Sequence, residues 1–244
     1  METDVTSRLH TYCLQRPRHE GTEVSTVSTT ETPATPLSES AYTLLRDRIV
    51  FLEIAPGQPV NEASIAAELG IGRTPVREAL KRLEADHLVV SYPRRGTFAS
   101  NVDLSELNDL AEIRRKLEPV AARRAAAGQG GDFRAQIEET IASLDAERLQ
   151  LDRATLLRTD TEVHRLIYAS SGNGHLVETL MRLDDLVTRI WGTVLDRLND
   201  ITDNVAEHRA LLQAVLDGDP DLAERLAEEH VDHFTSSVQS ALSR

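Results

Sequence analysis

The eleven residues from Gly70 to Leu80, GIGRTPVREAL, combine a tight turn, a helix start and arginines at helical spacing. Upstream of them, Asn61 is placed to cap a short helix, which Gly70 ends as a C′ glycine does. A second helix is expected to begin with Thr74 as its N-cap and Pro75 at its first position, where the missing N–H of proline costs nothing. This order predicts a helix-turn-helix.

The second helix of this motif has an apolar side and a charged side. Val76, Leu80 and Leu83 recur at the spacing of one helix face, which predicts that they pack inward. Three cations lie four residues apart on another face: Arg73, Arg77 and Lys81. They are placed where recognition helices meet base edges in the major groove. A solvated surface is the alternative, but its usual Glu–Lys pairing is missing at the leading end of the stripe.

The residues after this helix predict a β-hairpin. Residues 88–92 have strand composition, residues 93–96 form a turn signal, and residues 97–99 return as a second strand. Two adjacent arginines at the tip, Arg94 and Arg95, suit contacts with DNA phosphates or with the minor groove. The whole segment is therefore expected to be a winged helix.

Residues 42–100 resemble the DNA-binding domain of the GntR family of bacterial transcription regulators. The segments VNEASIAAELGIGRTPVREAL and RRGTF carry the resemblance. It implies operator contacts from Arg73, Thr74, Arg77 and wing residues that include Gly96. Some relatives also place an operator-contacting arginine where this chain has Ala63, so the resemblance implies no arginine contact from that position.

Charge is divided unevenly along the 244 residues, whose net charge is −13. Residues 38–100 carry eight Lys/Arg and eight Asp/Glu, whereas residues 101–244 carry sixteen and twenty-seven. A neutral domain with its arginines on one face can still bind DNA. No apolar run of transmembrane length and no signal-peptide pattern is present, so a soluble, cytoplasmic protein without membrane contact is expected. The single cysteine, Cys13, excludes an intrachain disulfide.

Three segments are expected. Residues 1–37, rich in Ser, Thr and Pro, form a disordered tail, and residues 38–100 form the winged-helix DNA-binding domain. From residue 101 to residue 244, apolar residues recur at helical spacing in six stretches: Leu104–Ala127, Phe133–Leu151, Leu156–Ser170, Leu176–Leu198, Val205–Leu216 and Leu222–Leu242. Short connections favour antiparallel neighbours. The expected fold class is mainly α, a winged helix-turn-helix with a hairpin wing followed by an all-α six-helix bundle.

Four residues of the expected bundle stand out for their chemistry: Asp160, His164, His208 and His230. Asp160 and His164 lie four residues apart in a helical stretch, so both side chains project from one face and can share one cation. Imidazole nitrogens with one carboxylate oxygen suit zinc, nickel, manganese or ferrous iron and leave coordination positions open. Taken singly, each histidine would instead be an ordinary surface or core residue.

The segments EIRRKLEPVAARRAA, DTEVHRLIYASSGN, EHRALLQAVLDGD and AEEHVDHF resemble the FCD effector domain found in the FadR branch of the same family. In metal-containing members an aspartate and three histidines bind one divalent cation, and the resemblance implies this role for the four residues named above. Zinc, nickel or manganese is the implied ion. His233 is the chief competitor for the fourth ligand, and His175 lies outside the pattern. A polar cavity lined by histidines is the alternative.

The FCD resemblance also implies an effector-binding and dimerisation domain that senses a small carboxylic acid. A metal with open positions can bind a carboxylate directly, and a cationic side chain would hold the far end of the acid. Arg114 matches a family position that is often turned toward the effector, and Arg189 is a weaker candidate on the helix that holds Trp191. Surface salt bridging is the alternative role of both arginines.

These observations separate three classes of function. A ligand-responsive transcription regulator, binding a palindromic operator as a homodimer, accounts for every strong feature. A metal-dependent enzyme on the bundle would leave the winged helix unexplained, and no HExxH-like pairing supplies a general base. A DNA-packaging protein would be strongly basic. The sequence therefore predicts a regulator and not an enzyme.

Overall fold

Residues 37–147, 153–197 and 202–242 are described by the computed structural model, and they divide into two units, 37–101 and 102–242. The expected disordered tail, apart from Leu37, and Cys13 lie outside these residues. Leu37 itself already belongs to the first helix of the first unit.

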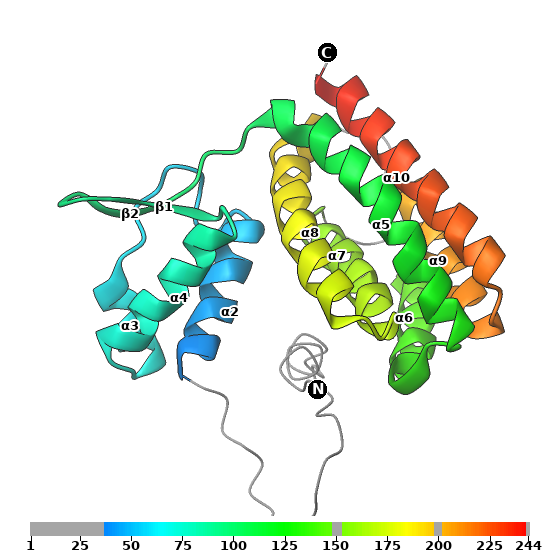
Figure 1. Cartoon of the computed structure of the whole chain (residues 1–244). Coiled ribbons are helices and arrows are strands. Elements are labelled where there is room, and N and C mark those ends of the chain that lie inside the picture. Colours follow the sequence, from blue (N-terminus) through cyan, green and yellow to red (C-terminus); the bar gives the residue numbers. More distant parts are fainter. Residues whose placement is uncertain (1–36, 148–152, 198–201, 243–244) are drawn as a thin grey trace, which may run out of the picture. The chain divides into compact units, whose positions relative to one another are not determined.

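Three helices and a hairpin form the first unit (Figure 1). They are α2 (Leu37–Val50), α3 (Glu62–Leu69), α4 (Arg73–Ala85), β1 (Val89–Tyr92) and β2 (Gly96–Ala99). Helix α2 packs against α4, and fully buried side chains lie on both helices, among them Leu45, Ile49, Val76 and Leu83. The apolar stripe of α4 is thus buried as predicted.

The hairpin is antiparallel, with Val89 opposite Ala99 and Tyr92 opposite Gly96. At its tip the Arg95 N–H donates to the Tyr92 carbonyl at 3.1 Å. Arg94 has a φ of 63°, in the left-handed region that the third residue of a type II turn requires, and Pro93 precedes it. The wing therefore ends in a tight turn that carries two arginines.

The caps of the two short helices confirm one prediction and correct another. Asn61 accepts hydrogen bonds from the N–H groups of Ala63 and Ser64, and Gly70 ends α3 with a φ of 64°. The prediction of Thr74 as N-cap of α4 is wrong, because the N-cap is Gly72 and the helix begins at Arg73. Pro75 sits at the third helical position. The N–H groups of the first turn have no partner within the helix, so proline is tolerated there as well as at the first position.

Six α-helices and three short 3₁₀ turns form the described part of the second unit. They are α5 (Leu107–Ala127), α6 (Arg134–Glu147), α7 (Arg153–Ser170), α8 (Gly174–Val194), α9 (Thr202–Asp217) and α10 (Pro220–Leu242). The predicted six-helix bundle is confirmed. The predicted ends at Leu151 and Leu198 fall outside the described residues. None of the described helices is both long enough and apolar enough to cross a membrane.

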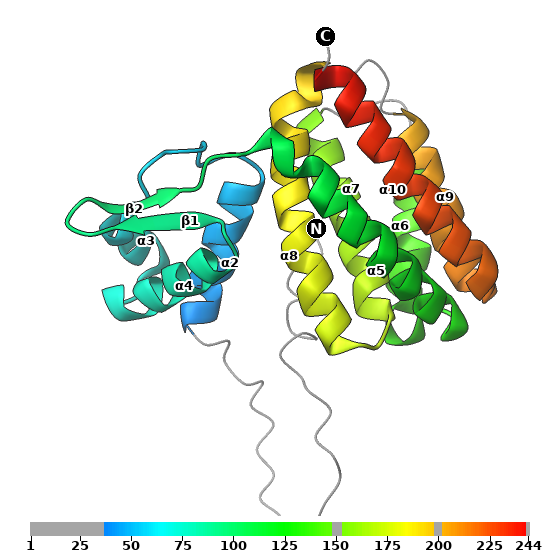
Figure 2. The same cartoon turned by 45° about the horizontal axis from the view of Figure 1, so that its top comes forward.

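Helix α5 contacts four other helices of this bundle, α7, α8, α9 and α10. Figure 2 shows α5 and α10 side by side along their length. Ala121, Ala122, Ala125 and Ala126 are all buried on α5, and their small side chains allow neighbouring helices to approach closely. Helices α7, α9 and α10 therefore share α5 as a packing partner.

Candidate metal centre and DNA-binding surface

The predicted DNA contacts of the first unit are all exposed. On α4 these are Arg73, Thr74, Arg77 and Lys81, and on the wing they are Arg94, Arg95 and Gly96. Gly96 has a φ of 95°, which a residue with a side chain rarely adopts. The guanidinium of Arg95 lies 5.8 Å from the centre of the Tyr92 ring.

Arg77 has a partner that the sequence did not indicate. Its Nε donates to Oε2 of Glu62 at 2.9 Å, so the first residue of α3 contacts the second turn of α4. The side chain of Arg77 is nevertheless 62% exposed. The stripe of Arg73, Arg77 and Lys81 therefore lacks ion pairs within α4, as predicted, but Arg77 is paired with a residue of α3.

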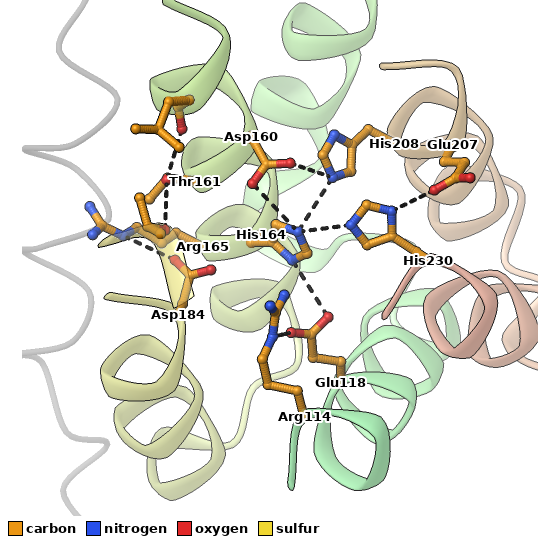
Figure 3. A network of polar contacts seen from close by, with 12 residues as sticks. Arg114, Glu118, Asp160, Thr161, His164, Arg165, Asp184, Glu207, His208 and His230 are labelled. Atoms are coloured by element: carbon orange, nitrogen blue, oxygen red, sulfur yellow. Dashed lines mark hydrogen bonds and ion pairs between the residues drawn. The ribbon is translucent and has the colours of Figure 1, made fainter. Parts of the chain in front are cut away.

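The four predicted metal ligands come together in the interior of the bundle (Figure 3). Asp160 and His164 lie on α7, His208 on α9 and His230 on α10. Each offers one ligand atom, and these four atoms all lie within 4.8 Å of one another. All four side chains are buried. The structure thus joins residues from three helices that are up to seventy positions apart in the sequence.

The imidazoles meet through their Nε2 atoms. His164 Nε2 lies 3.1 Å from His230 Nε2 and 3.4 Å from His208 Nε2. His208 Nε2 is also 3.4 Å from Oδ1 of Asp160. Three ring nitrogens and one carboxylate oxygen therefore converge on one point. These atom types are the ones that zinc and other borderline divalent cations bind.

The outward nitrogens of two of these rings face carboxylates. His230 Nδ1 lies 2.8 Å from Oε2 of Glu207, and His164 Nδ1 lies 3.6 Å from Oε2 of Glu118. The Tyr168 hydroxyl donates to Glu118 at 2.8 Å and lies 3.3 Å from His164 Nδ1. A carboxylate that accepts a hydrogen bond from Nδ1–H keeps the proton on Nδ1 and leaves the Nε2 lone pair directed inward. Metal-binding histidines are held in this way.

Burial favours the uncharged form of His164 and of His208. It lowers the pKa of His164 and of His208 well below 6.5, and the neighbouring histidines and Arg114 lower both further. Neutral imidazole is the form that binds a metal. When His164 and His230 hold their protons on Nδ1, their Nε2 lone pairs face each other at 3.1 Å. A cation between them would relieve that repulsion, so the donor set fits a divalent ion.

Arg114 lies beside this cluster (Figure 3), whereas Arg189 lies on α8. Arg114 is 3% exposed, and its Nε donates to Oε1 of Glu118. Its charge acts on both His164 and His208. Arg189 is also buried, and desolvation lowers its pKa to about 10 against the opposing effect of Asp185. Both side chains lie in the interior of the bundle, and Arg114 forms a buried ion pair with Glu118 rather than a surface one.

Two further histidines lie outside the cluster. His233 has an exposed side chain, and its Nδ1 lies 2.7 Å from Oε1 of Glu207 rather than facing the metal ligands. His175 is exposed on α8. His230, not His233, is therefore the residue of α10 that the structure places with the other three.

Comparison with known proteins identifies both units. Residues 37–99 match the gntR family of bacterial regulatory proteins, and residues 109–233, half of the chain, match the FCD domain. The chain belongs to the GntR family. It is a DNA-binding transcription regulator with an FCD domain, and not an enzyme.

Relatives of this GntR regulator cover most of its length. It is 32% identical over 195 residues to a probable D-xylose utilization operon transcriptional repressor of Paenarthrobacter nicotinovorans, and the match covers 77% of this chain and 84% of that protein. It is 27% identical over 216 residues to the HTH-type transcriptional repressor RspR of Escherichia coli K12, covering 88% and 94%. Escherichia coli McbR/YncC shares the fold, with a TM-score of 0.73 at 20% identity over 84% of this chain and 98% of that chain.

Three glutamates of this regulator were not predicted as site residues. Glu62 contacts Arg77, Glu118 contacts Arg114 and Tyr168, and Glu207 contacts His230 and His233. Only Glu118 carried a local signal, because it lies four residues after Arg114 on one helix face. Glu62 and Glu207 meet their partners across separate helices, which helical periodicity does not reveal.

Proposed function

We propose that this GntR regulator is a homodimer that binds a palindromic operator and senses a small carboxylic acid at a divalent cation in its bundle. The observation that carries the proposal is the convergence of three buried Nε2 atoms and one carboxylate oxygen in a chain that also has a DNA-binding domain. Burying three imidazoles and a carboxylate together costs free energy, which a cation bound between them would offset. A sensory role would account for such a group in a regulator.

The cation would be held by Asp160, His164, His208 and His230, with zinc, nickel or manganese as the ion. When bound, it would supply a Lewis-acidic centre for an effector carboxylate, because four protein ligands leave further positions open for the metals that accept six. Glu118 and Glu207 would orient the rings of His164 and His230.

Arg114 would hold the effector as well. Its guanidinium is buried beside the cluster, and among the described residues only its Nε donates a hydrogen bond, to Glu118. The two Nη atoms are therefore available to a carboxylate, which a guanidinium binds through two parallel hydrogen bonds. Arg189 stays a weaker proposal, because the charge that acts on it is that of Asp185.

The DNA-binding half of the proposal rests on the exposed residues Arg73, Thr74, Arg77, Lys81, Arg94, Arg95 and Gly96. The helix cations would enter the major groove and the wing would contact phosphates. A second copy would supply the other half-site. Ile113 and Val120, which lie seven residues apart on α5 and are 45% and 43% exposed, offer apolar surface for such an interface. The cytoplasm is the compartment in which an operator is accessible.

Thermal melting of the full-length protein tests the sensor. Chelator-treated protein would be melted alone, with zinc, nickel or manganese, and then with each metal plus acetate, lactate, malate or citrate. We expect the metal to raise the melting temperature and at least one acid to raise it further only when metal is present, because any ligand that prefers the native state stabilises it. An acid that stabilises metal-free protein equally would contradict metal-assisted binding.

Two variants separate the roles of the arginines. Arg114→Lys keeps the charge beside Glu118 but loses the guanidinium fork, so it should retain the metal-induced shift and lose most of the acid-induced shift. Arg189→Lys tests the weaker candidate in the same way, and retention of both shifts would exclude Arg189 from effector binding. Release or tightening of operator DNA by the same acid would then show that the bundle regulates the winged helix.

A further inference from the structure

The cations of α4 differ in what holds them. Within the part of the chain that the structure describes, neither Arg73 nor Lys81 forms an ion pair, whereas Arg77 pairs with Glu62 and Arg82 pairs with Glu39 at 2.6 Å. Arg82 also lies 4.0 Å from the centre of the Tyr42 ring, on the side of α4 that faces α2. Arg77 is therefore the one member of the exposed stripe that a carboxylate holds in the described structure.

The hydrogen bond from Arg77 uses only Nε. That atom donates to Glu62 Oε2 at 2.9 Å, and the hydrogen bonds of the described residues leave both Nη atoms of Arg77 without a protein partner. Because a guanidinium is planar, an anchor at Nε limits rotation of the whole group while its two terminal nitrogens stay exposed. Arg77 is thus restrained and still able to bind.

A second ion pair of α3 shows the contrast. Arg48 of α2 donates to Glu68 through both Nη atoms, at 2.8 and 2.5 Å. Its two terminal nitrogens are occupied by the carboxylate, as expected for a pair that only joins two helices. Glu62 and Glu68 stand on the same helix, but only Glu62 leaves the fork of its arginine available.

The backbone that carries Glu62 is well anchored. Asn61 caps α3 through two backbone N–H groups, and the N–H of Val60 donates to the Thr97 carbonyl of β2 at 2.9 Å. Glu62 is the first residue of α3, where the positive end of the helix dipole favours a charged carboxylate. The acceptor that restrains Arg77 is therefore itself fixed in place.

We propose that Glu62 is a positioning residue for base recognition: it holds Arg77 so that both Nη atoms face O6 and N7 of one guanine in the major groove. A bidentate arginine–guanine contact distinguishes guanine from the other bases. Restraining the side chain before binding reduces the conformational entropy that it loses on binding. A carboxylate near DNA also repels phosphates, so Glu62 favours the correct sequence at the expense of binding to any sequence. This inference rests on the proposed operator recognition.

Sequence selection with the full-length protein provides the test. Duplexes would be selected by the wild type from a randomised library, and affinity would be measured at one salt concentration for the selected duplex and for single base-pair replacements. We expect Glu62→Ala to lower discrimination by about tenfold at one G·C pair in each half-site. Affinity for unrelated duplexes should stay the same or rise. Glu62→Gln keeps a hydrogen-bond acceptor for Nε and should restore most of the discrimination.

Arg77→Ala identifies the base pair concerned. It should abolish discrimination at the same G·C pair, and adding Glu62→Ala to it should change nothing further there. Glu68→Ala, which breaks the other ion pair of α3, should leave discrimination at that pair intact. Melting temperatures of all variants would confirm that they fold.

Three results would overturn the inference. Unchanged discrimination in Glu62→Ala would show that Arg77 needs no positioning. Equal weakening of all duplexes by Glu62→Ala and by Glu68→Ala would show that the ion pair between Glu62 and Arg77 only holds α3 and α4 together. In both cases operator recognition itself would stand. Failure of the wild type to select any duplex would overturn operator recognition and this inference together.

Discussion

The two units of the chain use ionisable side chains in opposite ways. Arg77 in the first unit has a side chain that is 62% exposed, whereas His164 and His208 in the second are 3% and 2% exposed. An exposed cation is solvated until an external partner arrives, and its removal changes binding but little else. A buried polar group must be satisfied within the fold or by a bound ion. The exposed arginine of the first unit is therefore suited to contact with an external partner, and the buried histidines of the second unit are suited to binding an ion in the interior.

Removing Arg77 should have the largest effect, and only on binding. We expect Arg77→Ala to abolish operator-specific binding while the melting temperature stays close to that of the wild type. A bidentate base contact contributes about 1–3 kcal/mol, and a dimer loses it twice. The measurement is affinity for the selected duplex against an unrelated duplex, with a thermal melt. Unchanged specificity in a folded variant would show that exposure on α4 does not identify the base-contacting residue.

His208→Ala should have the next largest effect, and on stability rather than DNA contact. The variant removes one of three ring nitrogens from the cluster, so we expect it to lose bound metal and the metal-induced stabilisation. That stabilisation is about 2.7 kcal/mol for a ligand present at a hundredfold excess over its Kd. Elemental analysis of protein purified without chelator or a metal-binding tag, together with melting curves, measures both.

His175→Ala is the matched control for that variant, because His175 is exposed and lies outside the cluster. It should change neither metal content nor melting. If the wild type contained no divalent metal, and added zinc, nickel or manganese stabilised it no more than His208→Ala, the four residues would be pocket lining rather than ligands.

The contrast between exposed and buried side chains also explains how much of the structure of each unit could be predicted from the sequence. In the first unit, Asn61 and Gly70 act through neighbours close in sequence, and the apolar stripe of α4 follows helical periodicity, so all were predicted correctly. The start of α4 was not, because a proline fits any position of a first turn. The bond between Glu62 and Arg77 crosses two helices, and nothing in the spacing of either residue indicates it.

In the second unit, periodicity alone predicted six helices and the shared face of Asp160 and His164. It could not bring His208 and His230 to that face, because packing of α9 and α10 decides this, and the family resemblance supplied it. The carboxylates beside the histidine cluster could not be predicted for another reason. Glu118 and Glu207 lie in a segment with many acidic residues, most of them exposed, so their position beside histidines depends on the fold.

Acid should destabilise the metal-free bundle by a smaller amount. Burial lowers the pKa of His164 and His208 well below 6.5, so below that pH the unfolded chain binds more protons than the folded one. Stability should therefore fall as pH decreases from about 6.5, by up to about 1.4 kcal/mol per pH unit for each histidine. Urea unfolding at pH 7.5, 6.5 and 5.5, followed by fluorescence of the single tryptophan Trp191, would measure it.

His233 provides a control of opposite sign for this titration. Its hydrogen bond with Glu207 raises its pKa, so protonation of this residue stabilises the folded state as pH falls. His233→Gln should remove that contribution and make the loss of stability steeper. A stability that does not change between pH 7.5 and 5.5 in this variant would show that the central histidines are not held neutral.

Removing the arginines of the wing should give the smallest change in sequence specificity. Arg94 and Arg95 stand exposed at a hairpin tip, and neither has a carboxylate partner among the described residues that would orient it as Glu62 orients Arg77. Side chains without such restraint suit phosphates, which repeat along every sequence.

The double variant Arg94→Ala, Arg95→Ala should weaken binding to specific and unrelated duplexes alike. It should also lower the slope of log affinity against log salt concentration by about 0.9 for each phosphate that the wing no longer binds. Lys116→Ala with Arg225→Ala removes the same charge from exposed positions of the bundle and controls for net charge. Loss of preference at a single base pair would instead make the wing a direct base-contacting element, and restraint by a carboxylate would no longer distinguish the two groups of arginines.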